Sequence, residues 1–169
     1  MGELKPQDVL LLLELDAHRD EPWTFARVSE TLHLSQGEVA NVVRRSTKAG
    51  LFNAEAGRPV RAALYEFLVH GLRYVFPAEP GPRTRGVPTA GSAPPLSEVL
   101  TAAEVPMVWP WSEGTVRGDG LEPLYKTAPR VALADPVMYR RLALVDALRI
   151  GSARERRLAA DFLKKKMAS

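Results

Sequence analysis

Polar side chains that can hydrogen-bond to the edges of DNA bases stand close together in the first third of the chain. The amides of Gln36 and Asn41 can each form two hydrogen bonds to adenine, and the guanidinium of Arg44 can do the same to guanine. The small residues Gly37 and Ala40 lie between them, which would let a helix backbone approach the bases closely. This pattern is typical of a surface that reads base pairs.

Three neighbouring residues extend this candidate surface. Ser35 immediately precedes it, and Arg45 and Lys48 follow it toward the C-terminal end of the same segment. At that distance from the base-reading residues, cationic side chains are better placed for backbone phosphates. We therefore expect the segment to contact duplex DNA through both bases and phosphates.

Two short helices joined by a tight turn must position these side chains. Thr24 is the expected N-cap of the first helix, whose apolar residues Phe25, Val28 and Leu32 fall at i, i+3 and i+7. Ser35 is the expected N-cap of the second helix, and Glu38 completes a capping box three residues later. The sequence predicts a buried face for the second helix, formed by Val39, Val42 and Val43, and an end at Gly50.

The block LSQGEVANVVRRSTKAGL, with the preceding FARVSETLH, resembles the DNA-binding segment of bacterial winged helix-turn-helix transcriptional regulators of the MarR/ArsR-like type. The resemblance covers roughly residues 5–52. His33 stands where such turns usually carry glycine, and Ser46 stands where an apolar residue would continue the buried stripe. The alternative interpretation is a generic three-helix bundle with a polar outer face.

A β-hairpin wing normally follows the recognition helix in that family, but here the pattern after residue 56 is helical. We therefore expect a postponed wing, with one strand at residues 74–76, a loop at 77–82 and a return strand at 85–89. Arg83 and Arg85 would then reach phosphates or a minor groove. The alternative is a proline-rich linker whose arginines are solvated.

The leucine-rich helix expected at residues 6–17 is interpreted as buried between neighbours or in a dimer interface. Trp109 and Trp111 are expected in a core or in the pocket of a partner protein rather than stacked on bases. Asp135 and Ser152 are expected to cap two C-terminal helices, and the basic side chains of the last helix are a second candidate contact surface.

Composition narrows the function classes. The chain of 169 residues has no cysteine, and its three histidines are widely spaced, so we expect no catalytic residues, no metal site and no cofactor. The net charge is only +3, and residues 1–50 carry six basic and eight acidic side chains. DNA affinity is therefore expected to depend on a local patch rather than on a uniformly basic surface. An apolar stretch long enough to cross a membrane and a signal peptide are both absent from the sequence, which favours a cytoplasmic protein.

The expected fold is mainly α, with a winged helix-turn-helix DNA-binding domain at residues 1–91 and a C-terminal helical region for dimerisation or partner binding at 92–169. The expected function is sequence-specific binding of double-stranded DNA by a homodimeric repressor, because operators are usually two-fold symmetric. The alternative function is an antitoxin-like or adaptor protein, whose C-terminal region binds a partner protein while the N-terminal motif regulates its own operon.

Overall fold

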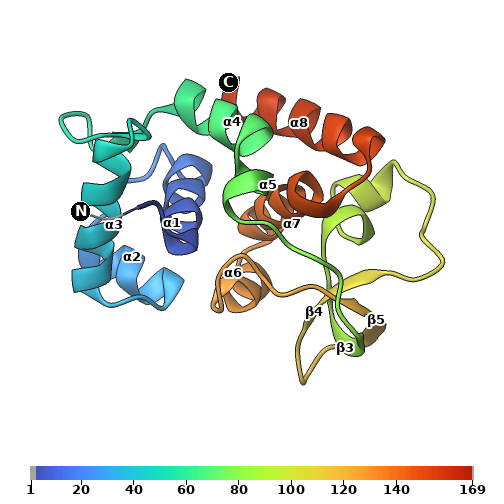
Figure 1. Cartoon of the computed structure of the whole chain (residues 1–169). Coiled ribbons are helices and arrows are strands. Elements are labelled where there is room, and N and C mark those ends of the chain that lie inside the picture. Colours follow the sequence, from blue (N-terminus) through green and yellow to red (C-terminus); the bar gives the residue numbers. More distant parts are fainter. Residues whose placement is uncertain (1–2, 169) are drawn as a thin grey trace.

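A computed structural model describes residues 3–168, which are mostly helical with one small sheet and one short hairpin (Figure 1). The elements of the first half are α1 (Pro6–Ala17), α2 (Phe25–Leu32), α3 (Gln36–Lys48), β1 (Phe52–Asn53), β2 (Arg58–Pro59), α4 (Arg61–His70) and α5 (Leu72–Val75). Those of the second half are β3 (Arg83–Pro88), the 3-10 turns η1 (Ala90–Ser92) and η2 (Leu96–Glu98), β4 (Met107–Pro110), β5 (Val116–Gly120), α6 (Ala128–Ala134), α7 (Pro136–Ile150) and α8 (Ala153–Ala168). The expectation of a mainly α fold is confirmed.

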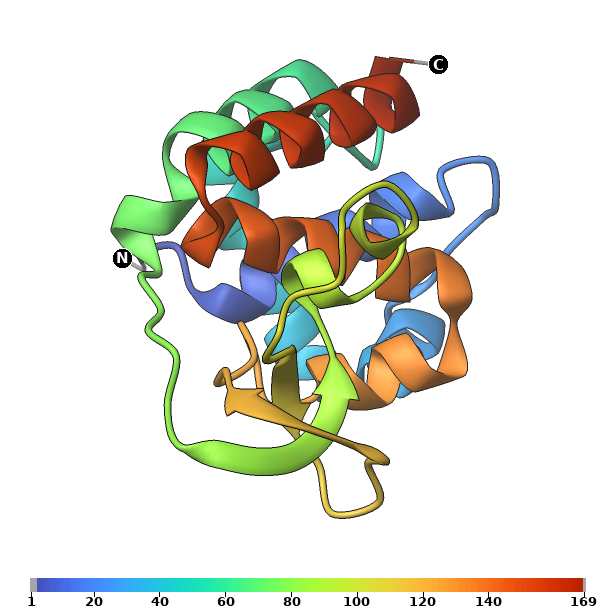
Figure 2. The same ribbon diagram turned by 90° about the vertical axis from the view of Figure 1, so that its right-hand side faces the viewer.

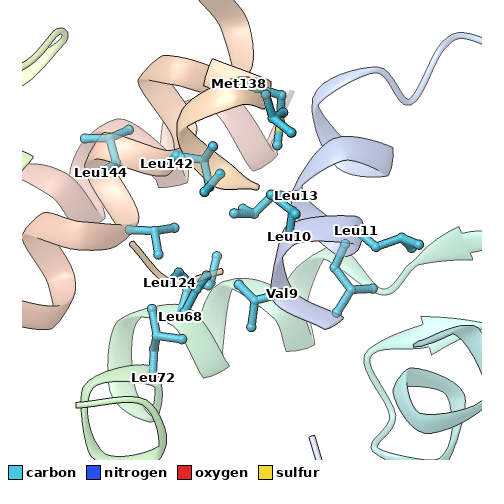
Figure 3. Packing of buried hydrophobic residues seen from close by; sticks show 14 of the residues in the cluster. Val9, Leu10, Leu11, Leu13, Leu68, Leu72, Leu124, Met138, Leu142 and Leu144 are labelled. Carbon is cyan, nitrogen blue, oxygen red and sulfur yellow. The ribbon is translucent and has the colours of Figure 1, made fainter. Parts of the chain in front are cut away.

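Helix α1 lies at the centre of the core. Its five consecutive apolar residues, Val9 to Leu13, are fully buried. Figure 3 shows several of them beside Leu68 of α4, Met138 of α7, and Leu124 from the segment before α6. Leucines occupy several faces of α1 because helices from both halves of the chain surround it. Of the two positions expected for this helix, burial between neighbouring helices is confirmed and a dimer interface is not, since the chain's own helices already cover these side chains.

Two buried aspartates of α1 tie this central helix to its neighbours. Asp8 accepts hydrogen bonds from Arg45 of α3. Asp16 accepts a hydrogen bond of 2.7 Å from Nε of Arg61 in α4 and one of 2.6 Å from Nη1 of Arg141 in α7. Because a buried carboxylate must be paired, these contacts define how α3, α4 and α7 pack around α1.

The three strands of the second half close on one another. Strand β3 pairs antiparallel with both β4 and β5, and β4 pairs in parallel with the end of β5. Gly86 of β3 lies so close to β4 that a Cβ there would be 1.8 Å from the carbonyl oxygen of Trp109. Only glycine allows the strands to approach in this way.

This sheet corrects two expectations. Residues 72–75 continue the helical region as α5, and β3 takes its partners from residues 107–120, so the postponed wing is wrong. The helical periodicity extends to Val75, so residues 74–75 form no strand. The strands that pair with β3 begin about 20 residues or more after it, which is too far for a local hairpin pattern in the sequence. A domain boundary between residues 91 and 92 would cut through this sheet, and α1 and α7 pack directly on each other.

A buried carboxylate on α7 holds the sheet in place. Oδ2 of Asp146 accepts 2.7 Å hydrogen bonds from Oγ1 of Thr89 and Nε1 of Trp109, and Oδ1 accepts one of 3.1 Å from Nη1 of Arg149. Burial raises the pKa of Asp146, although Arg149 and the two hydrogen bonds act in the opposite direction. Trp109 is 1% exposed, which confirms its expected place in a core.

The C-terminal helices begin where the sequence predicts. Backbone N–H of Val137 donates to Oδ1 of the N-cap Asp135, and that of Glu155 donates to Oγ of Ser152. Helix α8 packs along α4 and α7, as Figure 2 shows, and buries Ala159. Within residues 3–168, every helix is too short or too polar to cross a membrane.

Candidate nucleic-acid interface

Local capping defines the ends of α2 and the start of α3. Oγ1 of Thr24 accepts from the backbone N–H of Arg27 at 3.1 Å, and Oγ of Ser35 accepts from that of Glu38 at 3.0 Å. Between the helices, His33 adopts a left-handed conformation with φ of 56°. Three residues therefore suffice to turn the chain from one helix into the next.

The inner face of α3 packs against the core as its apolar spacing predicts. Val39 and Val42 are fully buried, and Val43 is partly buried beside them. Ser46 is also fully buried, and its hydroxyl has no hydrogen-bond partner among residues 3–168. The helix nevertheless continues to Lys48, so a polar residue in the stripe does not end it.

The outer face of α3 presents most of the predicted DNA-binding residues together. Ala40 and Asn41 are half-buried at the centre of this face, and Nη2 of Arg44 donates a 2.6 Å hydrogen bond to Oδ1 of Asn41. The exposed residues around them are Ser35, Gln36, Gly37, Arg44 and Lys48. We call these seven residues the α3 face.

Arg45 lies at the edge of this face, one turn after Asn41, but it is buried against α1. Its Nε donates to both carboxylate oxygens of Asp8, at 3.1 and 2.9 Å, and its Nη2 donates to Oδ1 of Asp8 at 2.7 Å and to Oε1 of Glu38 at 3.0 Å. The hydrogen bond to Asp8 raises the pKa of this guanidinium above its usual value. The expected phosphate contact does not fit this burial, because the donors of Arg45 join α3 to α1.

Arg83 and Arg85 lie far from the α3 face. Both belong to β3, which Figure 1 places at the opposite end of the molecule from α3. Nε of Arg83 donates to Oδ1 of Asp119 on the neighbouring strand β5 at 3.2 Å. The expectation that these arginines hold the same DNA segment as α3 therefore does not fit the fold.

A hairpin directly follows α3, where the sequence analysis expected none. Phe52 pairs with Pro59, and Asn53 pairs with Arg58. Oδ1 of Asn53 accepts from two backbone N–H groups in the turn, and Gly57 has a φ of 65°. Asn53 and Gly57 are residues that favour a turn and could have indicated it. Two-residue strands, however, are too short to produce an alternating pattern.

Trp23 anchors this hairpin to the start of α2. Its Nε1 donates a 3.0 Å hydrogen bond to the carbonyl oxygen of Gly57, and its ring stacks on Phe25 and meets Phe52 edge-on. The hairpin is therefore held beside α2 and α3. Its turn carries the acidic Glu55 and no basic residue between positions 54 and 57.

Comparison with models of protein families, with curated protein sequences and with solved structures finds no match for this chain. The candidate interface therefore depends on its own geometry: a capped helix, anchored to the core on one side, that presents amide and guanidinium groups on the other.

Proposed function

We propose that this protein binds duplex DNA in a sequence-specific way through the α3 face and acts as a transcriptional regulator. The observation that carries the proposal is the clustering of Gln36, Asn41 and Arg44 on the solvent-facing side of one capped helix. An α-helix fits the major groove, where amide and guanidinium groups can distinguish base pairs. In this arrangement α2 and α3 form the helix-turn-helix, and β1 and β2 take the place of a wing.

The support of α3 by the core favours this role. Recognition requires that the helix keep its orientation when its outer face meets DNA, and the Asp8–Arg45 pair and the valine face hold it from the inside. Gln36, Asn41 and Arg44 would contact bases, while Ser35 and Lys48 would contact phosphates at the two ends of the helix. Gly37 and Ala40 would let the backbone approach the groove. The hairpin turn, with its acidic Glu55, would contribute little to phosphate binding.

Selection from a random duplex library, followed by fluorescence anisotropy on the enriched sequence, tests the proposal. N41A and R44A are expected to lose about 1–3 kcal/mol of discrimination at particular base pairs. K48A is expected to weaken binding to all sequences and to reduce its dependence on salt concentration. The double variant R83A/R85A is the control, because it removes two positive charges, as many as R44A and K48A together, from a distant part of the molecule, and we expect it to bind like wild type.

Two results would contradict the proposal. Failure of the library to yield an enriched sequence would exclude sequence-specific binding. If R83A/R85A lost affinity while R44A and K48A kept it, the interface would lie on the sheet and not on α3.

Repression by a homodimer remains part of the proposal, because a two-fold symmetric operator would need two copies of α3. The dimer would have to use a surface other than α1, whose apolar residues are already buried. Analytical ultracentrifugation with and without the enriched duplex would count the copies bound. The alternative of a partner-binding C-terminal region loses its main support, since Trp109 is used inside the protein.

A further inference from the structure

Three potential metal ligands meet where the end of α1 faces the start of α7. Nε2 of His18 lies 2.7 Å from Oδ2 of Asp135 and 3.9 Å from Oε1 of Glu14. One ligand atom from each of the three residues lies within 4.8 Å of the other two. Glu14 lies in the last turn of α1 and His18 caps its C-terminal end, whereas Asp135 lies 117 positions after His18 in the chain.

Glu14 carries a second, independent indication that something is bound there. The residue is 8% exposed, and its Oε2 has no hydrogen-bond partner among residues 3–168. A buried carboxylate oxygen without a partner is costly. Glu14 and His18 both line a small cavity of about 40 Å³, which is large enough for one ion or one water molecule.

The charges around His18 favour a cation. Glu14 and Glu21 line the cavity with it, and Asp135 contacts the same imidazole from outside that lining. Glu14, Glu21 and Asp135 bring three carboxylates, and the nearby Arg27 offsets one of them through its contact with Glu21 at 3.9 Å. Oε1 of Glu21 lies 3.9 Å from Nδ1 of His18, where it could orient the ring while Nε2 binds an ion. Oδ1 of Asp135 accepts from the backbone N–H of Val137, and Oδ2 is hydrogen-bonded to Nε2 of His18 at 2.7 Å, so an ion would replace this His18–Asp135 hydrogen bond.

We propose that Glu14, His18 and Asp135 bind one divalent transition-metal ion of the zinc class. One imidazole nitrogen with two carboxylate oxygens suits zinc better than calcium or magnesium, which prefer oxygen ligands alone. Tetrahedral zinc keeps its ligand atoms about 3.3 Å apart, so His18 and Asp135 would separate slightly and Glu14 would move inward. Any proton on Nε2 of His18 would pass to solvent, and a water molecule would complete the coordination.

Such an ion would join the two halves of the chain. Glu14 and His18 belong to the helix at the centre of the core, and Asp135 caps α7, which carries the sheet through Asp146. Because binding to the folded state alone stabilises it, zinc is expected to raise the thermal stability of the whole protein.

Isothermal titration of the metal-free full chain with zinc chloride tests this inference. Wild type is expected to bind one zinc ion with micromolar or tighter affinity and to melt several degrees higher with zinc, whereas calcium and magnesium have little effect. E14Q and H18Q are expected to weaken zinc binding about tenfold or more. H70Q, which changes an exposed histidine elsewhere, is the matched control and is expected to bind like wild type.

Two variants separate ligand loss from unfolding. E14Q removes a buried charge whose Oε2 has no hydrogen-bond partner among residues 3–168 and whose Oε1 lies 3.9 Å from His18, so we expect its melting temperature without metal to equal or exceed that of wild type. D135N keeps an N-cap side chain for α7 but replaces a carboxylate ligand by a weaker amide. Absence of zinc binding to wild type would overturn the inference and leave a buried water as the partner of Glu14. Equal losses in H70Q and H18Q would also overturn it, since they would show adventitious binding to surface histidines.

Discussion

The N-terminal helices α1 to α3 and the three-stranded sheet β3 to β5 are both attached to the core by a buried carboxylate, but they differ in where its partners come from. Asp8 of α1 pairs with Arg45 of α3, and both helices have local start signals. Asp146 of α7 instead collects Thr89 and Trp109 from two separate segments of the second half. The first attachment reinforces helices that the sequence already specifies. The second attachment holds the segments of β3 and β4, which lie apart in the sequence and form a sheet only by pairing with each other.

Removing the carboxylate that holds the sheet should have the largest effect. D146A leaves the indole N–H of Trp109 and Nη1 of Arg149 without their carboxylate acceptor, and we expect a loss of about 3–5 kcal/mol in the free energy of unfolding. Urea denaturation measures this loss. D119A, which removes the exposed partner of Arg83, is the control and should cost about 0.5 kcal/mol or less. Equal effects of the two variants would contradict the assigned role of Asp146.

The adjacent arginines of α3 should separate stability from DNA binding. R45A leaves Asp8 buried without its partner and is expected to cost about 3 kcal/mol of unfolding free energy. R44A removes an exposed side chain and should change stability by about 0.5 kcal/mol or less, while it weakens binding to the enriched duplex. A large loss of stability in R44A would show that the two sides of α3 are assigned the wrong way round.

One type of substitution, glycine to alanine, should have opposite effects in the two regions. G86A would place a Cβ against the backbone of β4 and is expected to cost about 2–3 kcal/mol, because the strands must separate. G37A in the first turn of α3 meets only Oγ of Ser35 at 3.9 Å and should stabilise the helix by about 0.5 kcal/mol. Thermal melts compare both variants. Tolerance of G86A would indicate that β3 and β4 are less tightly paired.

The smallest effect is expected at the turn between α2 and α3. His33 adopts φ of 56°, which costs a non-glycine residue free energy, and H33G should relieve it and stabilise the protein by about 0.5 kcal/mol. Chemical denaturation of H33G beside H70G, which introduces the same residue at a helix end with ordinary geometry, measures the difference. Destabilisation by H33G would mean that the imidazole makes a contribution of its own.

The features that could be predicted from the sequence depend on contacts between residues that are close together in the chain. Thr24, Ser35, Asp135 and Ser152 cap helices because a side-chain oxygen reaches a backbone N–H two or three residues away. Val39 and Val42 lie inside because the helical period brings them to one face. The seven residues of the α3 face follow from the same rule. Arg45 was expected beside them because of its charge, and it is buried instead.

The remaining features depend on partners that are distant along the chain. The short hairpin β1–β2 is anchored by Trp23, strand β3 pairs with residues 107–120, and His18 meets Asp135 across 117 positions. Periodicity and capping carry no information about such pairings, because each depends on how completed helices pack around α1. The sequence by itself determined helices α1 to α3, α7 and α8, the caps of α2, α3, α7 and α8, and the polar face of α3, but it did not reveal α6. Only the tertiary structure decided the buried positions of Arg45 and Asp146, since burial of a charge depends on finding a partner elsewhere in the fold.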